Sequence, residues 1–309
     1  EFQMSSVTNV QTYQQVTDAP AGFNKSLKIT NNSTTQATAA GVLCTPRQKI
    51  EGLNTAYLNW GTSDAQTVTV SFWVKASVTG TYPVALTNNN FSRSFVTNYT
   101  VSVANTWEYK TVTIAGDTSG TWTVDTTTGI NVLFSLDTGS TYQTTAGSWQ
   151  AGNYRGTSSD VHFLANASAT WQITGVQLEA NTTATPFENL QYTTQLQLCQ
   201  RYLPAFSGIS NWFGFGIIIN TSRLFSTATY KVPTRVAPTG LVISSASHFQ
   251  CGDMIATSNL ASAISISSSG TDSALLDVTS SVANLTAARP GVVVATSASA
   301  LLYFTGCEL

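Results

Sequence analysis

The chain has 309 residues, of which 13 are Lys or Arg and 15 are Asp or Glu, so only 9% are charged. Hydrophobic residues make up 42%, which excludes intrinsic disorder, because disorder requires low hydrophobicity and high net charge. A net charge of −2 without a basic stripe argues against nucleic acid as the main partner. The longest apolar stretch, residues 215–219, is far too short to cross a membrane, so no membrane insertion is expected.

The clearest predicted strand covers residues 68–75 (VTVSFWVK), where apolar and mostly polar positions alternate. Val68, Val70, Phe72 and Val74 are expected on one face of this strand. Similar short runs, separated by Gly, Asn and Asp turns, occur at 98–103, 107–114, 129–136, 161–165 and 170–179. Several short strands at this spacing predict a β-sandwich or jelly roll over residues 1–188.

A change of pattern near residue 190 predicts a short helix. Residues 190–201 contain no Gly or Pro, and Leu190, Thr194, Leu198 and Tyr202 recur at helical spacing. Leu196 and Cys199 are likewise three residues apart, and Pro204 would end the helix. We interpret residues 189–203 as a helical linker, which could serve as a hinge or as a contact between subunits.

The remainder, residues 204–309, again predicts strands, and adjacent aromatic residues at 212–215 suggest a subunit contact on one strand face. About 105 residues suffice for a second, smaller β-sandwich at the tip of the chain. The predicted class is therefore all-β. The strands are expected at 213–220, 223–232, 239–245, 263–268, 274–279 and 291–309.

The cysteines and histidines do not form a metal motif. The four cysteines are far apart and include no CxxC pair, and there are only two histidines, so neither a metal site nor a cofactor is expected. Two long-range disulfides and four buried thiols both fit the spacing. We expect buried thiols, because a core of this size needs no disulfides. These residues are Cys44, Cys199, Cys251, Cys307, His162 and His248.

Sequence motifs for catalysis are also missing. There is no GxSxG elbow, HExxH helix or glycine-rich phosphate loop. His162 falls in the predicted strand 161–165, which favours a structural role. The carboxylates that could serve a depolymerase lie in turn contexts, where Asp is favoured for backbone hydrogen bonding. They are Asp117, Asp125, Asp137 and Asp160. The sequence therefore predicts no enzyme and no catalytic residue.

The segment 137–160 is the first candidate for a binding site. It is a long connection between predicted strands, and such loops are often functional. Sugar binding needs aromatic faces beside polar groups, because a pyranose has an apolar face and a polar rim. Tyr142, Trp149, Tyr154 and Arg155 supply both. The alternative is that Trp149 and Tyr154 pack this loop onto the sandwich.

Trp73 is a second candidate for glycan binding. It lies opposite Phe72 and Val74 on the predicted strand, on a side that a jelly roll could leave open. Burial against the other sheet is the alternative for this residue. Three further tryptophans are interpreted as core or sheet-edge residues: Trp60, Trp107 and Trp122.

Several short sequence motifs resemble those of bacteriophage tail-fibre and related virion appendage proteins. In the first half they are LNWG at 58–61, SFWVKAS at 71–77, GTY at 80–82, NTWE at 105–108 and GDTSGTW at 116–122. ITGVQLE at 173–179 followed by TPFE at 185–188 is the most specific, and LCQRY at 198–202 opens the second domain. The resemblance covers most of residues 1–202, whereas residues 205–300 match no phrase of the family.

The resemblance implies a jelly roll related to carbohydrate-binding modules, a β-rich tip and assembly as a homotrimer in the virion. It predicts a distal tail-fibre segment that attaches to a glycan or another receptor on the bacterial surface. The start Glu1-Phe2-Gln3-Met4 suggests a piece of a longer polypeptide, whose missing N-terminal part would contact other virion proteins. The alternatives are a head fibre, capsid decoration or baseplate protein without a receptor and, third, a polysaccharide depolymerase.

Overall fold

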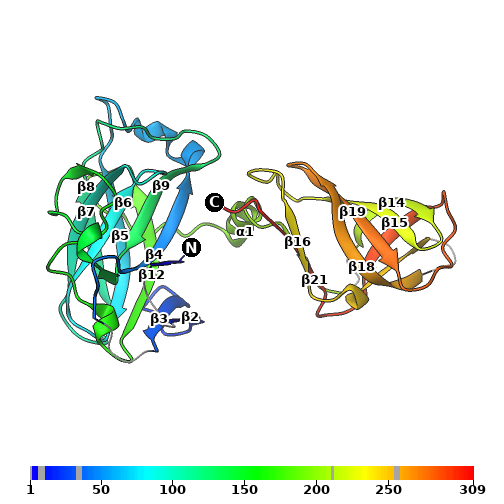
Figure 1. Cartoon of the computed structure of the whole chain (residues 1–309), viewed down its shortest axis with the longest axis horizontal. Helices are drawn as coiled ribbons and strands as arrows, with labels where there is room; N and C mark the ends of the chain where they lie inside the picture. The colour runs from blue at the N-terminus through cyan, green and yellow to red at the C-terminus, as the bar shows by residue number, and fades with distance from the viewer. Residues whose placement is uncertain (1, 6–10, 33–36, 210–211, 254–257) are drawn as a thin grey trace. The chain divides into compact units, whose positions relative to one another are not determined.

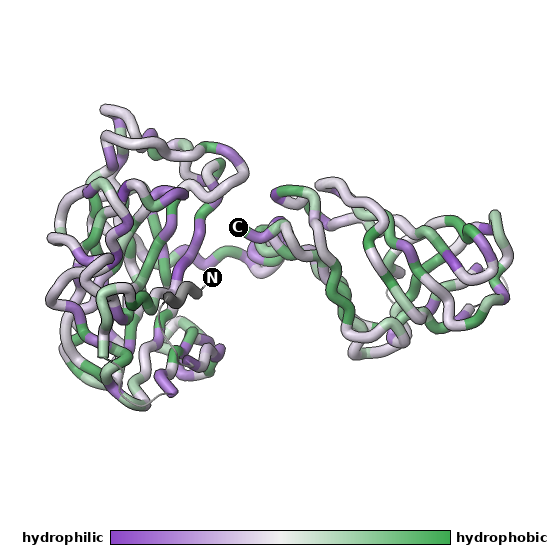
Figure 2. The backbone as a smooth tube through the Cα atoms, in the orientation of Figure 1, coloured by the Kyte–Doolittle hydropathy of each residue, from purple (hydrophilic) through white to green (hydrophobic). Residues whose placement is uncertain are grey.

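The computed structural model describes residues 2–5, 11–32, 37–209, 212–253 and 258–309 (Figure 1). The chain separates into two compact units, Glu1–Glu188 and Asn189–Leu309. Strands dominate both units, and Figure 2 shows hydrophobic stretches along the strands of each. The predicted all-β class is confirmed.

The N-terminal unit is a β-sandwich of two antiparallel sheets. The larger sheet has the order β1 (Phe2–Ser5), β4 (Leu43–Glu51), β9 (Thr128–Phe134), β6 (Gly80–Thr87), β7 (Arg93–Val101) and β11 (Trp149–Ala151), and β10 (Asp137–Thr138) also pairs with β4. The five-stranded sheet has the order β2 (Gln11–Val16), β3 (Ser26–Asn31), β12 (Thr170–Glu179), β5 (Val68–Ala76) and β8 (Glu108–Ile114). The N-terminal unit also contains short 3₁₀ turns at Gly52–Asn54, Ala56–Leu58, Ser140–Tyr142 and Phe163–Ala165.

The core lies between these two sheets, and the alternation on β5 explains its position. Val68, Val70, Phe72 and Val74 share one face of β5, as predicted. All four are fully buried, and they pack against aromatic residues of the facing sheet. The Phe72 ring contacts Phe134 edge-on, with 5.0 Å between ring centroids. Residues between these positions on β5 therefore point away from the core.

One predicted strand of this unit is wrong. Residues 161–165 do not extend as a strand, because Phe163–Ala165 forms a 3₁₀ turn. The carboxylate of Asp137 accepts a hydrogen bond from the Leu164 N–H at 3.0 Å and also contacts Nδ1 of His162 at 3.2 Å, which fixes this turn. Strands β4 and β6 were not predicted, and each contains a proline, Pro46 or Pro83, a residue that normally argues against a strand.

The C-terminal unit begins with helix α1 (Tyr192–Gln200), close to the predicted helix. Its strands form a closed barrel in the order β14 (Trp212–Asn220), β15 (Arg223–Thr229), β19 (Ser273–Ser280), β18 (Ser258–Ser269), β17 (Phe249–Asp253) and β20 (Pro290–Ala295). Strands β13 (Ala205–Ser207), β21 (Leu301–Thr305) and β16 (Gly240–Ile243) form a separate sheet, and a 3₁₀ turn, Ala246–His248, precedes β17. In the described residues, no helix has the length and apolar character needed to cross a membrane.

The second, smaller β-sandwich expected in this unit is a closed barrel with a small additional sheet. Strand β14 pairs with β15 on one side and with β20 on the other, which closes the barrel. Alternating burial, as on β19, occurs in both a sandwich and a barrel, because each buries one face of every strand. The sequence pattern therefore cannot distinguish them. The predicted strand 291–309 is likewise divided into β20 and β21.

All four cysteines are free thiols. Cys44, Cys251 and Cys307 are buried, as expected, and burial raises the pKa of each thiol. Cys199 differs from the expectation because it is exposed on helix α1.

Candidate functional site

The segment 137–160 is more ordered than a structureless loop. It contains β10, the 3₁₀ turn Ser140–Tyr142 and β11, which pairs with β7. Outside the main core, the ring of Tyr154 packs on a small buried cluster of Ala85, Val96 and Leu133. Because this cluster lies apart from the main core, the segment covers part of the outer face of the larger sheet.

Trp149 belongs to a group of aromatic residues that joins the segment to the sandwich. Its ring centroid lies 5.3 Å from that of Trp60 and 5.4 Å from those of Trp122 and Phe95. Its indole N–H donates a hydrogen bond to the Ala115 carbonyl at 2.7 Å. This packing corresponds to the alternative considered for Trp149, in which it holds the loop onto the sandwich.

Arg155 is also enclosed, with only 1% of its surface exposed. Its guanidinium carbon lies 4.4 Å from the centroid of the Phe91 ring, and its Nε donates to Oδ1 of Asn153 at 3.0 Å. Burial, together with the charge of Arg47, lowers the pKa of Arg155 to about 10. Tyr142 is half-buried nearby, with its ring centroid 5.9 Å from the Arg155 guanidinium carbon. The glycan contacts predicted for Tyr142, Trp149, Tyr154 and Arg155 remain predictions.

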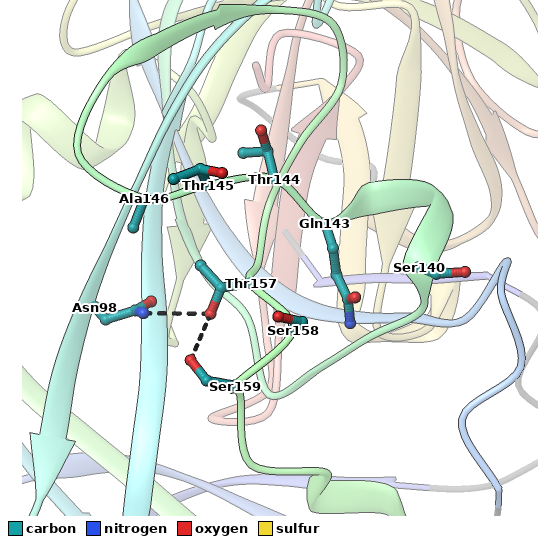
Figure 3. Close-up of a pocket in the computed structure, with 9 residues that line it drawn as sticks. All are labelled: Asn98, Ser140, Gln143, Thr144, Thr145, Ala146, Thr157, Ser158 and Ser159. Atoms are coloured by element: carbon teal, nitrogen blue, oxygen red, sulfur yellow. Dashed lines mark hydrogen bonds between the residues drawn. The ribbon is translucent and has the colours of Figure 1, made fainter.

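The same segment lines an open hollow of about 620 Å³ (Figure 3). Its lining carries hydroxyl and amide groups and no charged side chain. Figure 3 shows the Asn98 amide and the Ser159 hydroxyl both directed at the Thr157 hydroxyl, at 3.2 and 3.1 Å. The lining residues are Asn98, Ser140, Gln143, Thr144, Thr145, Ala146, Thr157, Ser158 and Ser159.

A buried carboxylate, that of Asp160, fixes the lining residue Thr157. Thr157 donates to Asp160 through its hydroxyl at 2.6 Å and through its N–H at 2.8 Å, and Thr138 donates a third hydrogen bond at 3.1 Å. Burial raises the pKa of Asp160, while these hydrogen bonds oppose the rise. Because its oxygens accept hydrogen bonds from the protein itself, Asp160 acts as a support for Thr157.

Trp73 lies opposite Phe72 and Val74 on β5, as predicted, and this places it on the outer face of the five-stranded sheet. It is half-buried and pairs across the strands with Tyr109 of β8, with 5.4 Å between ring centroids and 49° between ring planes. Tyr109 is 44% exposed. On the other side of β5, Thr174 of β12 is the cross-strand partner of Trp73. The two rings thus form a partly open aromatic pair on this face.

Polar groups adjoin this pair on the same face. Lys75 follows Trp73 by two residues, so the two side chains point to the same face of the sheet. Gln172 of β12 is the cross-strand partner of Lys75. The carboxylate of Asp18 accepts hydrogen bonds from Lys75 at 2.8 Å, from the Trp107 indole at 3.1 Å and from Gln172 at 3.2 Å. We call Trp73, Tyr109, Trp107, Lys75, Gln172 and Asp18 the aromatic face. It combines aromatic rings with polar groups held in place by hydrogen bonds.

The ionisation of Asp18 gives a test of this network. The hydrogen bond from Lys75 lowers the pKa of Asp18 below its ordinary value of 3.8. The stabilisation it provides is complete above pH 3.8 and is lost as the pH falls through the lowered pKa. In an NMR pH titration we expect the Asp18 carboxyl carbon to titrate below pH 3.8, and K75M to raise that midpoint. A wild-type midpoint at or above 3.8 would contradict the network.

The sequence indicated only Trp73 as a binding residue of the aromatic face. Tyr109 was within a predicted strand, but its position beside Trp73 depends on the β5–β8 register. Asp18 lies 57 residues from Lys75 and 154 from Gln172, so local pattern gave no sign of their contact. Trp107 was interpreted as a core or sheet-edge residue, and it lies just before β8 at the edge of the sheet.

The fold and this surface define a two-unit, all-β protein with a β-sandwich that carries a partly open aromatic face. No protein-family model matches the chain. No curated protein matches its sequence either.

Among solved structures, the chain is similar to the enzymatically active domain of tailspike protein 4 from bacteriophage CBA120, with 12% identity, a TM-score of 0.33 and coverage of 57% of this chain but only 19% of that one. It is similar to the CBM22-1 xylan-binding domain of Xyn10C from Paenibacillus barcinonensis, with 10% identity and a TM-score of 0.27. That match covers 59% of this chain and 87% of the xylan-binding domain. A third is a putative sugar-binding protein from Bacteroides thetaiotaomicron, with 13% identity, a TM-score of 0.30 and coverage of 58% and 86%. All three TM-scores are below 0.5, and the function proposed below rests on the residues of this chain.

Proposed function

We propose that the N-terminal unit binds a glycan on the aromatic face. The observation that carries this proposal is the partly open pair of Trp73 and Tyr109, with polar side chains beside it. The apolar face of a pyranose can stack on such rings, because aromatic side chains offer a large, flat apolar surface. The sugar hydroxyls would then exchange hydrogen bonds with Lys75 and Asp18, while the buried Gln172 holds the Asp18 carboxylate in place. The low charge of the chain favours a neutral, hydroxyl-rich ligand over an ionic one.

The network around Asp18 supports a preformed site. Its three donors come from β5, from β12 and from the residue before β8, and they hold the carboxylate in one orientation. Polar groups fixed before binding lose little conformational entropy when a ligand arrives, which improves affinity. We therefore expect the aromatic face to change little on binding.

We also propose that the chain serves a phage virion appendage, most specifically the distal part of a tail fibre that attaches to bacterial surface glycans. The support is the set of sequence motifs between residues 58 and 202 that resemble those of phage tail-fibre proteins. In such an appendage, repeated copies would multiply a weak site through effective concentration. This assignment includes the virion as location and other virion proteins as partners.

The proposed role is non-catalytic. The two histidines have structural neighbours: Nδ1 of His162 lies 3.2 Å from Asp137, and Nδ1 of His248 lies 2.9 Å from the Ser244 hydroxyl. Neither is part of the aromatic face. A polysaccharide depolymerase would release new reducing ends from host capsule, and we expect none when the chain is incubated with it.

Binding of the purified chain to an array of bacterial surface glycans tests the proposal. We expect the wild-type chain to bind a defined subset of the glycans, and W73A to bind none of that subset. T145A, in the hollow of Figure 3, is a matched control on the other sheet's outer face and should bind as the wild type does. Failure of the wild-type chain to bind any glycan or any host cell would reject glycan attachment.

A further inference from the structure

Within the described residues of the C-terminal unit, helix α1 is almost entirely uncovered. Every residue from Tyr192 to Cys199 is exposed, and Gln200 alone is buried. Its large apolar side chains are exposed as well, with 75% of Tyr192, 38% of Leu196 and 52% of Leu198 accessible. A helix of a folded domain normally buries one apolar side, so this helix lacks the packing that usually stabilises it.

Local interactions do not compensate for this lack of packing. The helix has nine residues, and isolated helices shorter than about 12–15 residues are marginal in water. Gln191 at its N-terminus makes no capping side-chain hydrogen bond, and the helix carries neither acidic residues in its first turn nor basic residues in its last. Its C-terminal end is attached to its own unit, where the Arg201 carbonyl accepts a hydrogen bond from the Arg235 N–H at 3.0 Å.

The apolar residues include a stripe with the spacing of a coiled coil. Tyr192, Leu196, Cys199 and Leu203 are separated by four, three and four residues, which places them on one side of the helix. Helical hydrogen bonding continues to Leu203, whose N–H donates to the Cys199 carbonyl at 3.0 Å. Leu203 is 40% exposed. We call these four residues the helix stripe. Leu198 lies away from it.

We propose that the helix stripe packs against the same stripe of a second copy of this chain. Apolar residues at this spacing fit the holes between side chains of another helix, and α1 is the one α-helix in the described residues. Because the described part of one chain contains no second α-helix, the partner helix would come from another copy. Residues 189–200 carry no charge, so two identical stripes can meet without repulsion. Arg201 falls on the opposite side of the helix, given 3.6 residues per turn.

This contact is independent of the glycan site, because the helix belongs to the C-terminal unit. It names the surface through which copies associate, and it gives the helix the packing it otherwise lacks. It also places the exposed Cys199 thiol inside the contact. The reactivity of that thiol therefore reports on the proposed packing.

The test compares two leucines of the same helix. By light scattering we expect the wild-type chain to be larger than its 32.8 kDa monomer. L196Q, on the helix stripe, should be monomeric, whereas L198Q should assemble as the wild type does. Both side chains are exposed in the single chain, so both variants should fold, with the circular dichroism spectrum of the wild type.

Thiol labelling provides the second readout. We expect a maleimide to label Cys199 slowly in the wild type and in L198Q, and rapidly in L196Q. A monomeric wild type would overturn the proposal. Slow labelling in that monomer would show that the stripe is covered by its own chain, whereas fast labelling would show that it stays exposed. Equal loss of assembly in L196Q and L198Q would also overturn it.

Discussion

Replacing Trp171 with alanine is expected to lower the free energy of unfolding of the N-terminal unit by about 3–5 kcal/mol, the usual cost of removing a buried large aromatic side chain. Trp171 lies on β12, is fully buried and packs near Phe134 of the facing sheet, with ring centroids 5.9 Å apart. Its removal would leave a cavity between the two sheets. Urea denaturation followed by circular dichroism measures the loss.

W171F is the matched control for this variant. It keeps an aromatic ring but loses the indole N–H, which donates to the hydroxyl of Tyr99 at 3.0 Å. A single buried hydrogen bond contributes about 1 kcal/mol, so we expect W171F to be much less destabilised than W171A. If W171A unfolds at the same urea concentration as the wild type, the described packing of the two sheets is wrong.

The second large effect concerns the aromatic face. The double variant W73A/Y109A should lose at least about tenfold in glycan affinity, since a tenfold change corresponds to about 1.4 kcal/mol and each ring contributes apolar contact area. The fold should persist, because both rings lie outside the core between the sheets. Unchanged stability together with lost binding would therefore locate the effect at the ligand.

The sequence predicted those features that depend on neighbours along the chain. The alternation at 68–75 placed Val68, Val70, Phe72 and Val74 on one face and Trp73 on the other, and residues 170–179 coincide with β12. The absence of Gly and Pro at 190–201 gave the helix. In contrast, the strand expected at 161–165 was wrong, because Asp137 fixes a turn there through a contact that the sequence does not reveal.

The candidate site could be predicted only in part, because it combines residues from separate strands. The segment 137–160 was predicted as a long connection, yet it contains two short strands and a 3₁₀ turn, and its Trp149 and Arg155 are engaged within the protein. The hydroxyl and amide groups of the same segment line the hollow instead. On the aromatic face, the cross-strand register brings Tyr109 beside Trp73, and tertiary contacts bring Asp18 to Lys75. No local spacing contains that information.

The central claim is tested most directly by calorimetric titration. The ligand is the oligosaccharide to which the wild-type chain binds most strongly on the glycan array. The wild-type chain, W73A/Y109A and a double variant of the hollow, Q143A/S159A, would be titrated side by side. We predict that W73A/Y109A loses at least about tenfold in affinity while Q143A/S159A binds as the wild type does. Wild-type affinity in W73A/Y109A would contradict the assignment of the glycan site to the aromatic face.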